Sequence, residues 1–208
     1  MAKQTIEISV PNNWSAVNLT KYLELQADLK AYEGEEEASL ATLFYHLCGI
    51  TPHIMNKLDT ETFLKIKDQL VKFVTKTDLP LIQSFVHNGK EWGFYPNLSK
   101  IEYGAYVDIS KLNSNELNED WAKVMAILYR PITKRVGKTY EVQAYTGEEE
   151  WEWFNELGMD IHFGAYFFFI NLSLGLLSAI PNSILKKAAE TLPNFKSTLE
   201  KSGITIQQ

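Results

Sequence analysis

The feature that most restricts how this chain can fold is a long segment without charged side chains. Residues Ile161–Leu185 include no Asp, Glu, Lys or Arg, although 22% of the 208-residue chain is charged. A helix of about 20 apolar residues is long enough to cross a small domain or a bilayer. Because such a helix is apolar on every face, the rest of the chain, a neighbouring subunit or a lipid phase has to cover it.

The composition of this segment favours a buried helix over a membrane anchor. Asn171 and Pro181 interrupt the apolar run, and His162 lies near its start. We therefore predict that a central helix of a globular protein begins at about residue 160. The alternative is a membrane-associated protein that inserts residues 163–180 into the bilayer.

The composition of the whole chain is that of an acidic globular protein. The chain is 45% hydrophobic and 12% aromatic, which is enough for a core, and its formal net charge is −6. Nucleic-acid-binding proteins usually carry a basic surface, so we expect no nucleic-acid partner. The single cysteine, Cys48, lies in an apolar pattern and is predicted to be a small buried hydrophobe, which fits a reducing cytoplasm. Met1 is followed closely by a strand-like run, so we expect no secretory signal.

Hydrophobic periodicity predicts several helices and a few strands. In the clearest helix, Ile66, Leu70 and Phe73 recur at spacings of four and three residues. The Asn-Gly pair at 88–89, between two aromatic arms, is typical of a β-hairpin. The predicted helices are 19–31, 37–48, 59–76 and 119–130, and the predicted strands are 5–10, 84–94 and 139–145.

These elements predict a mainly α-helical α+β protein with a single domain over residues 1–208. The other helices would pack around the central apolar helix, and a small antiparallel sheet would cover one side. Pro131 is expected to end the helix at 119–130. Arg130 is expected to have a structural role there, binding helix-end carbonyls or a nearby carboxylate. Residues 186–208 are expected to form a peripheral helix and a loose tail.

The residue patterns that common catalytic sites require do not occur in this sequence. It has no phosphate-binding GxxxxGK[ST] or GxGxxG motif, no GxSxG nucleophile motif, and no HExxH or CxxC pair. We therefore predict that the protein is not an enzyme and uses no cofactor or metal ion.

The histidines and the glutamate runs fit the same interpretation. His46 is expected to be a satisfied, half-buried side chain, and His87, beside the predicted hairpin turn, to be exposed. The glutamates at 35–37 and 148–150 are interpreted as solvated charge, because they lack the ligand spacing of a calcium loop. The alternative is an enzyme with an unrecognised polar pocket around His46, His53 or His162.

Aromatic side chains are the second route to a function. The chain has five tryptophans, and we expect Trp121 to be in the core. Trp151 and Trp153 flank one residue beside three glutamates; residues two apart on a helix do not share a face, so one can face the core and the other a partner. These two, together with Phe167 and Phe168 of the apolar helix, are the predicted partner-binding residues.

Several stretches of the chain resemble a family of tailed-bacteriophage proteins from phages of Bacteroidota and marine hosts. The resembling sequences are WSAVNLTKYLELQ near the start, ILYRPI at 127–132, the strand-like KTYEVQAYTGE, and MDIHFGAYFFFINL. The resemblance implies a protein of the phage particle or of its assembly, with no catalytic residue. The chain is also similar in character to tail-assembly chaperones, which bind the tape-measure protein before the tail tube polymerises.

The resemblance also implies what the protein contacts. We expect it to act through protein–protein contacts, as a tail-assembly chaperone or as a component of the particle. Its partners would be other phage structural proteins or further copies of itself, so an oligomer or a complex is expected, and a membrane partner is not. It would be present in the host cytoplasm during assembly, or in the virion.

Overall fold

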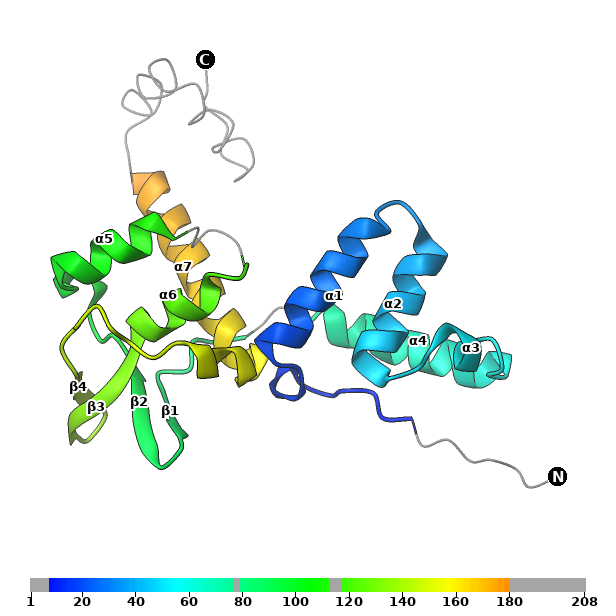
Figure 1. The fold of residues 1–208 in the computed structure, drawn as a ribbon, viewed down its shortest axis with the longest axis horizontal. Coiled ribbons are helices and arrows are strands. Elements are labelled where there is room, and N and C mark those ends of the chain that lie inside the picture. Colours follow the sequence, from blue (N-terminus) through cyan, green and yellow to red (C-terminus); the bar gives the residue numbers. More distant parts are fainter. Residues whose placement is uncertain (1–7, 77–78, 113–116, 180–208) are drawn as a thin grey trace, which may run out of the picture. The chain divides into compact units, whose positions relative to one another are not determined.

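The computed structural model describes residues 8–76, 79–112 and 117–179, with side chains up to residue 169. In this part of the chain the protein is α+β, with seven α-helices and a four-stranded antiparallel sheet, as predicted (Figure 1). The chain divides into two compact units, Met1–Ala165 and Tyr166–Gln208. The prediction of a single domain stays a prediction, and the predicted tail at 186–208 lies outside the described residues.

The first, second and fourth helices confirm the periodicity of the sequence. Asn18 caps the first of them, where its side chain accepts a hydrogen bond from the Lys21 amide, and Asp59 caps the fourth by accepting from the Thr62 amide. Gly49 ends the second with φ of +68°, a conformation that glycine adopts without strain. The helices are α1 (Leu19–Ala31), α2 (Glu36–Cys48), α3 (Pro52–Met55) and α4 (Thr60–Val74).

Trp14 joins these helices to the start of the last one. It lies in a short 3-10 helix, η1 (Trp14–Ala16), and is 5% exposed. Its ring lies 4.3 Å from that of Phe73 and 4.9 Å from that of Phe163, and the Tyr22 ring closes the cluster at 5.1 Å from Phe163. Aromatic pairs at these separations contribute more than their buried area alone, so this cluster is a main part of the core.

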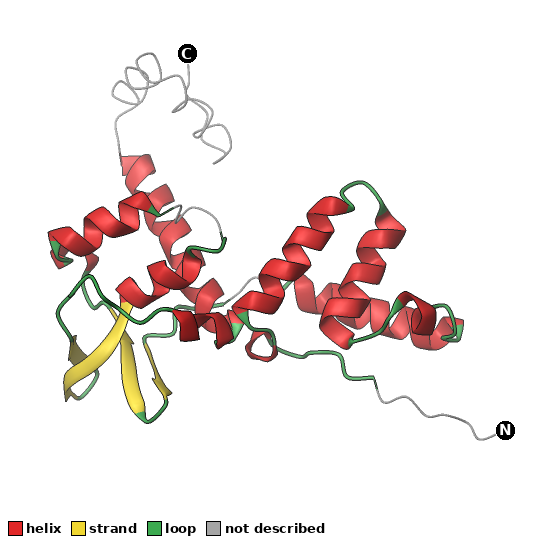
Figure 2. Ribbon diagram, viewed as in Figure 1, coloured by secondary structure: helices red, strands yellow, loops and turns green. Residues whose placement is uncertain are grey.

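The sheet differs in membership from the predicted one. Its strands follow in the order β1-β2-β3-β4, and Figure 2 shows them side by side. The predicted hairpin at 88–89 is confirmed, because Asn88 and Gly89 both have positive φ, at 48° and 74°. The predicted strand at 5–10 is not part of the described sheet: residues 1–7 lie outside the described residues, and residues 8–10 are not in a strand. The strands are β1 (Ser84–His87), β2 (Lys90–Phe94), β3 (Tyr129–Val136) and β4 (Thr139–Val142).

The helix predicted at 119–130 is shorter, and its end was interpreted wrongly. Helix α6 (Trp121–Leu128) passes directly into β3, in which Arg130 pairs with Gly93 and Pro131 with Trp92. Pro131 restricts the residue before it to extended backbone, which is a strand conformation as much as a helix stop. The helix ends before Pro131, at Leu128, and the strand that contains Pro131 was missed.

One face of the sheet carries an aromatic cluster. The Trp153 ring lies 4.2 Å from that of His87, almost parallel to it, and 4.6 Å from that of Trp92. Trp153 belongs to the 3-10 helix η3 (Glu152–Glu156), together with the fully buried Phe154. His87 is therefore half-buried under an indole, and the prediction of an exposed His87 was wrong.

The last described helix, α7 (Met159–Ala179), belongs to both units. Met159, His162 and Ala165 are fully buried in the first unit. The side chains of Tyr166–Phe169 belong to the second unit and are half-buried. The predicted helix therefore exists, but the position predicted for it at the centre of all the other helices is not confirmed. The remaining short elements are η2 (Leu98–Lys100) and α5 (Tyr103–Lys111).

Candidate functional site

Arg130, at the junction of α6 and β3, anchors the chain segment that leads into the candidate site. Its side chain is 1% exposed. The Nε donates to the Ile127 carbonyl at 3.0 Å, and Nη1 and Nη2 bind both carboxylate oxygens of Glu102 at 3.0 and 2.9 Å. Nη1 also donates to the Gln143 carbonyl at 3.0 Å. Both kinds of contact predicted for Arg130, to a helix-end carbonyl and to a carboxylate, are present.

This ion pair changes the titration of Glu102. Hydrogen bonds from Arg130 favour the charged carboxylate and lower the pKa of Glu102 to about 2. Glu102 also accepts a hydrogen bond from the Tyr145 amide at 3.1 Å. Arg130 and Glu102 together therefore fix the chain segment at Gln143 and Tyr145, which follows β4 and leads to the candidate site.

A second network fixes the Tyr145 side chain against α5. Its hydroxyl donates to Asp108 Oδ2 at 2.6 Å, and Lys111 Nζ donates to Asp108 Oδ1 at 2.9 Å. The Lys111 and Tyr145 hydrogen bonds lower the pKa of Asp108, while burial and the adjacent Asp108 carboxylate raise the pKa of Tyr145. Asp108 is thus a carboxylate at neutral pH, and both of its neighbours are already bound to it.

The loop after Tyr145 uses one of its three glutamates for its own structure. Glu149 accepts hydrogen bonds from the Thr146 amide at 2.8 Å and from the Thr146 hydroxyl at 3.2 Å. Gly147 turns the chain with φ of +83°. Glu148, Glu150 and the following Glu152 are exposed.

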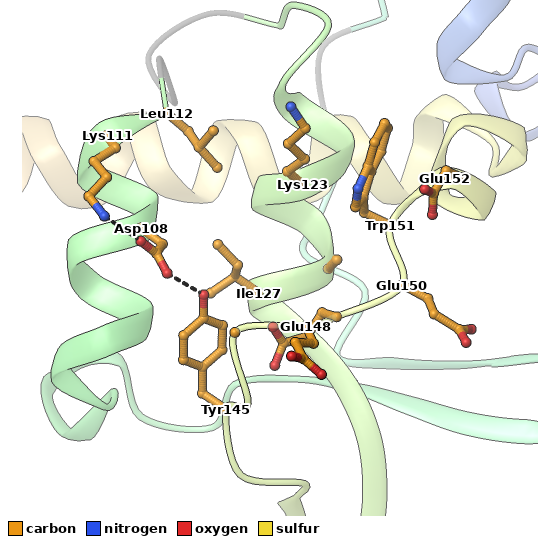
Figure 3. A pocket seen from close by; sticks show the side chains of 13 residues that line it. Asp108, Lys111, Leu112, Lys123, Ile127, Tyr145, Glu148, Glu150, Trp151 and Glu152 are labelled. Atoms are coloured by element: carbon orange, nitrogen blue, oxygen red, sulfur yellow. Dashed lines mark hydrogen bonds and ion pairs between the residues drawn. The ribbon is translucent and has the colours of Figure 1, made fainter.

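Residues of α5, of α6 and of the segment from Tyr145 to Glu152 line an open pocket of about 550 Å³. Figure 3 shows Ile127 at its floor, with Tyr145 and Asp108 on one side and the 148–152 segment on another. Lys123 of α6 points toward Trp151, and its ammonium lies 5.2 Å from the centroid of the indole ring. The Lys123 ammonium is also bound to Asp120 Oδ1 at 2.7 Å. The pocket therefore combines an apolar floor, an indole and several glutamates at its edge.

The structure places the predicted partner-binding residues in three environments. Trp151 is half-buried and lines the pocket, whereas Trp153 packs in the aromatic cluster on the sheet. Phe167 and Phe168 lie on α7 and are half-buried. The residues that sequence reasoning missed are Asp108, Lys111, Lys123 and Tyr145, which are brought to Trp151 from other elements. The sequence signal for this site was a tryptophan within an acidic run. That signal indicated the segment around Trp151 but not the residues of α5 and α6 that pack beside it.

The three histidines of the alternative enzyme prediction differ in burial and in partners. His46 is 8% exposed, and its Nε2 lies 2.7 Å from Asp28 Oδ2, so it is satisfied, as predicted, and more buried than predicted. His162 is fully buried beside the Phe154 carbonyl, and burial lowers its pKa to about 4. His53 is exposed. Among the described residues, no group of three His, Cys, Asp or Glu side chains is placed to hold a metal ion.

The comparisons with known proteins add no relative to this geometry. No family model, no curated protein and no solved structure matches the chain. Within residues 8–179, as far as they are described, no helix combines the length and the apolar character needed to cross a membrane.

Proposed function

We propose that this protein is a non-enzymatic virion or assembly protein of a tailed bacteriophage that works by binding other proteins. The observation that carries the proposal is the surface of α7 at Tyr166–Phe169. The described part of this helix, from Ile161 to Ala179, has no charged side chain. An apolar helix of this kind needs a cover over its whole circumference.

Four consecutive aromatic side chains indicate which part of α7 needs this cover. Successive residues of an α-helix are about 100° apart, so Tyr166, Phe167, Phe168 and Phe169 together point to all sides. Each of them is half-buried. Aromatic side chains are enriched in the cores of protein interfaces, where each buries a large apolar area. Phe167 and Phe168 are therefore the residues that we expect to contact a partner.

The phage context rests on the resemblance of WSAVNLTKYLELQ, ILYRPI, KTYEVQAYTGE and MDIHFGAYFFFINL to a tailed-phage family. The acidic charge and the lone cysteine, Cys48, are compatible with a protein that acts in the host cytoplasm during assembly. A tail-assembly chaperone and a particle component both fit this proposal. They differ in where the protein is found, because a chaperone is present in infected cells and absent from purified virions.

The test is the size of the purified protein, measured by light scattering without detergent. It is repeated after adding candidate tail-tube and tape-measure proteins of a tailed phage. We expect the protein to stay in solution and its mass to increase with one of these partners. The double variant Phe167→Gln/Phe168→Gln should weaken this complex at least tenfold. The matched control is Leu64→Gln/Val71→Gln, which removes two exposed apolar side chains of α4 and should leave the complex unchanged.

Two results would contradict the proposal. If both double variants weakened the complex equally, the α7 surface would not be the contact. If the protein needed detergent and was rescued by lipid vesicles, the alternative of a membrane-associated protein that inserts residues 163–180 would replace it.

A further inference from the structure

The four aromatic side chains of α7 belong to a small unit that continues past the end of the described helix. The unit Tyr166–Gln208 is compact by itself, and α7 supplies its first part, up to Ala179. On a helix without neighbours these rings would be largely exposed, whereas all four are half-buried. The nearest source of their cover is therefore the rest of the same unit, residues 180–208.

The sequence of residues 180–208 carries an apolar stripe that matches the apolar surface of α7. Its apolar residues recur at spacings of four, three, three and four: Leu185, Ala189, Leu192, Phe195 and Leu199. Lys187 and Glu190 fall between them, on the opposite side of such a stripe. Over residues 161–179 α7 has no charged side chain, so it favours contact with the apolar stripe rather than with the charged side.

The covalent connection is long enough to bring this stripe to the aromatic rings. Pro181 disfavours a continuation of α7, so the chain can turn back at that point. Ala179 lies about 16 Å along the helix from Phe168, since each residue adds about 1.5 Å. A helix that runs back over the same length uses about 11 residues, which would bring Leu192 and Phe195 level with the rings.

The same connection favours this segment over other occupants of the surface. A segment tethered by a short linker acts at an effective concentration in the millimolar range. A second copy of the protein in a micromolar solution is about a thousand times more dilute. The tethered segment is therefore the first occupant that the surface meets.

We propose that residues 183–200 cover Phe167 and Phe168 in the isolated protein and that a partner has to displace them. Leu192 and Phe195 lie against the two rings. This inference rests on the proposed function, because the covered surface is the contact surface proposed above. It adds a regulation to that surface, since the affinity for a partner falls in proportion to the fraction of molecules in the open state.

The first test is photo-cross-linking of the full chain at micromolar concentration. Phe168, and in a second protein Phe167, is replaced by p-benzoylphenylalanine, and the cross-linked peptides are identified by mass spectrometry. We expect cross-links within one chain to residues 185–199 from both positions, and none to this range from the control position Leu64, an exposed residue of α4. Cross-links between copies, cross-links only to residues before 166, or none at both positions would overturn the proposal.

The second test opens the surface and measures it with the dye 8-anilinonaphthalene-1-sulfonate, which binds exposed apolar surface. The variant Leu192→Gln/Phe195→Gln should increase the dye fluorescence at least twofold, and adding Phe167→Gln/Phe168→Gln should remove the increase. The control Lys187→Gln/Glu190→Gln changes two polar residues of the same segment, keeps the net charge, and should have no effect. Equal fluorescence in the two segment variants, or an increase that persists without Phe167 and Phe168, would overturn the proposal.

The two tests need no partner protein, so they separate this inference from the proposed function. In the light-scattering experiment, Leu192→Gln/Phe195→Gln should bind its partner at least threefold more tightly than the natural protein, and weaker binding would overturn the displacement. If no tail protein bound to any variant, the proposed function would fail, while the cross-links and the dye would still decide whether residues 183–200 cover α7.

Discussion

Replacing Arg130 by methionine should be among the most damaging single changes to the stability of this protein. Methionine keeps most of the apolar volume but removes every donor of the guanidinium. The Ile127 and Gln143 carbonyls then each lose one hydrogen bond, and the Glu102 carboxylate loses two. The Arg130 ring contact with Tyr95, at 4.6 Å, is lost as well.

The size of this effect follows from the burial of the two partners. Removing one member of a buried ion pair typically costs about 3–5 kcal/mol, because the other charge stays without a partner. The Glu102 side chain is 37% exposed and can be rehydrated, which places the expected loss near the lower end, at about 3 kcal/mol. The measurement is urea unfolding at pH 7, followed by tryptophan fluorescence and far-UV circular dichroism.

A matched control lies on the same strand. Arg135 binds Glu91 and stacks over Tyr140, but its side chain is 33% exposed and that of Glu91 is 40% exposed. Arg135→Met should therefore cost less than about 1 kcal/mol, as exposed ion pairs usually do. Equal losses of stability in the two variants would refute the reasoning. Unchanged stability of Arg130→Ala with lost partner binding would show that Arg130 is an interaction residue.

The same pair makes a pH dependence that can be measured independently. The pKa of Glu102 is lowered from 4.5 to about 2 in the folded protein. Its contribution to stability is therefore complete above about pH 4.5 and is lost as the pH falls from 4.5 toward 2. The difference in stability between the natural protein and Arg130→Met should shrink over this range, and a constant difference would contradict the assignment.

Two further substitutions test the packing of α7 in the first unit. In Gly164→Ala the new Cβ would lie 2.6 Å from the Pro80 carbonyl oxygen, which is a backbone atom. We therefore expect the free energy of unfolding in urea to fall by about 1–3 kcal/mol. The control is Gly104→Ala, whose new Cβ has its nearest contact at 3.4 Å and which should be neutral or stabilising. The pKa of His162 is lowered from 6.5 to about 4, so its contribution is complete above pH 6.5 and falls by about 3 kcal/mol as the pH drops toward 4. The variant His162→Gln should remove this part of the pH dependence of stability, whereas the control His53→Gln should keep it. If the natural protein had the same free energy of unfolding at pH 7 and at pH 4, the prediction for His162 would be contradicted.

The helices show what local sequence can determine. The caps at Asn18 and Asp59 and the stop at Gly49 were predictable because each depends on residues three or four positions away. The hairpin at 88–89 was predictable for the same reason. The strand at Tyr129–Val136 was not, because it follows a helix without a loop and contains a proline. Its pairing with Trp92 and Gly93 joins residues about 40 positions apart.

The candidate site also has some features that the sequence determined and others that only the fold determined. The sequence by itself determined that Trp151 stands within a run of glutamates and that residues 161–185 carry no charge. Only the tertiary structure decided that Glu149 is used by its own loop and that this segment lines an open pocket. It also decided that Trp153 packs on the sheet and Trp151 beside Lys123. The physical reason is that capping and periodicity act within one turn of the chain, whereas ion pairs and ring contacts depend on which distant segments fold together.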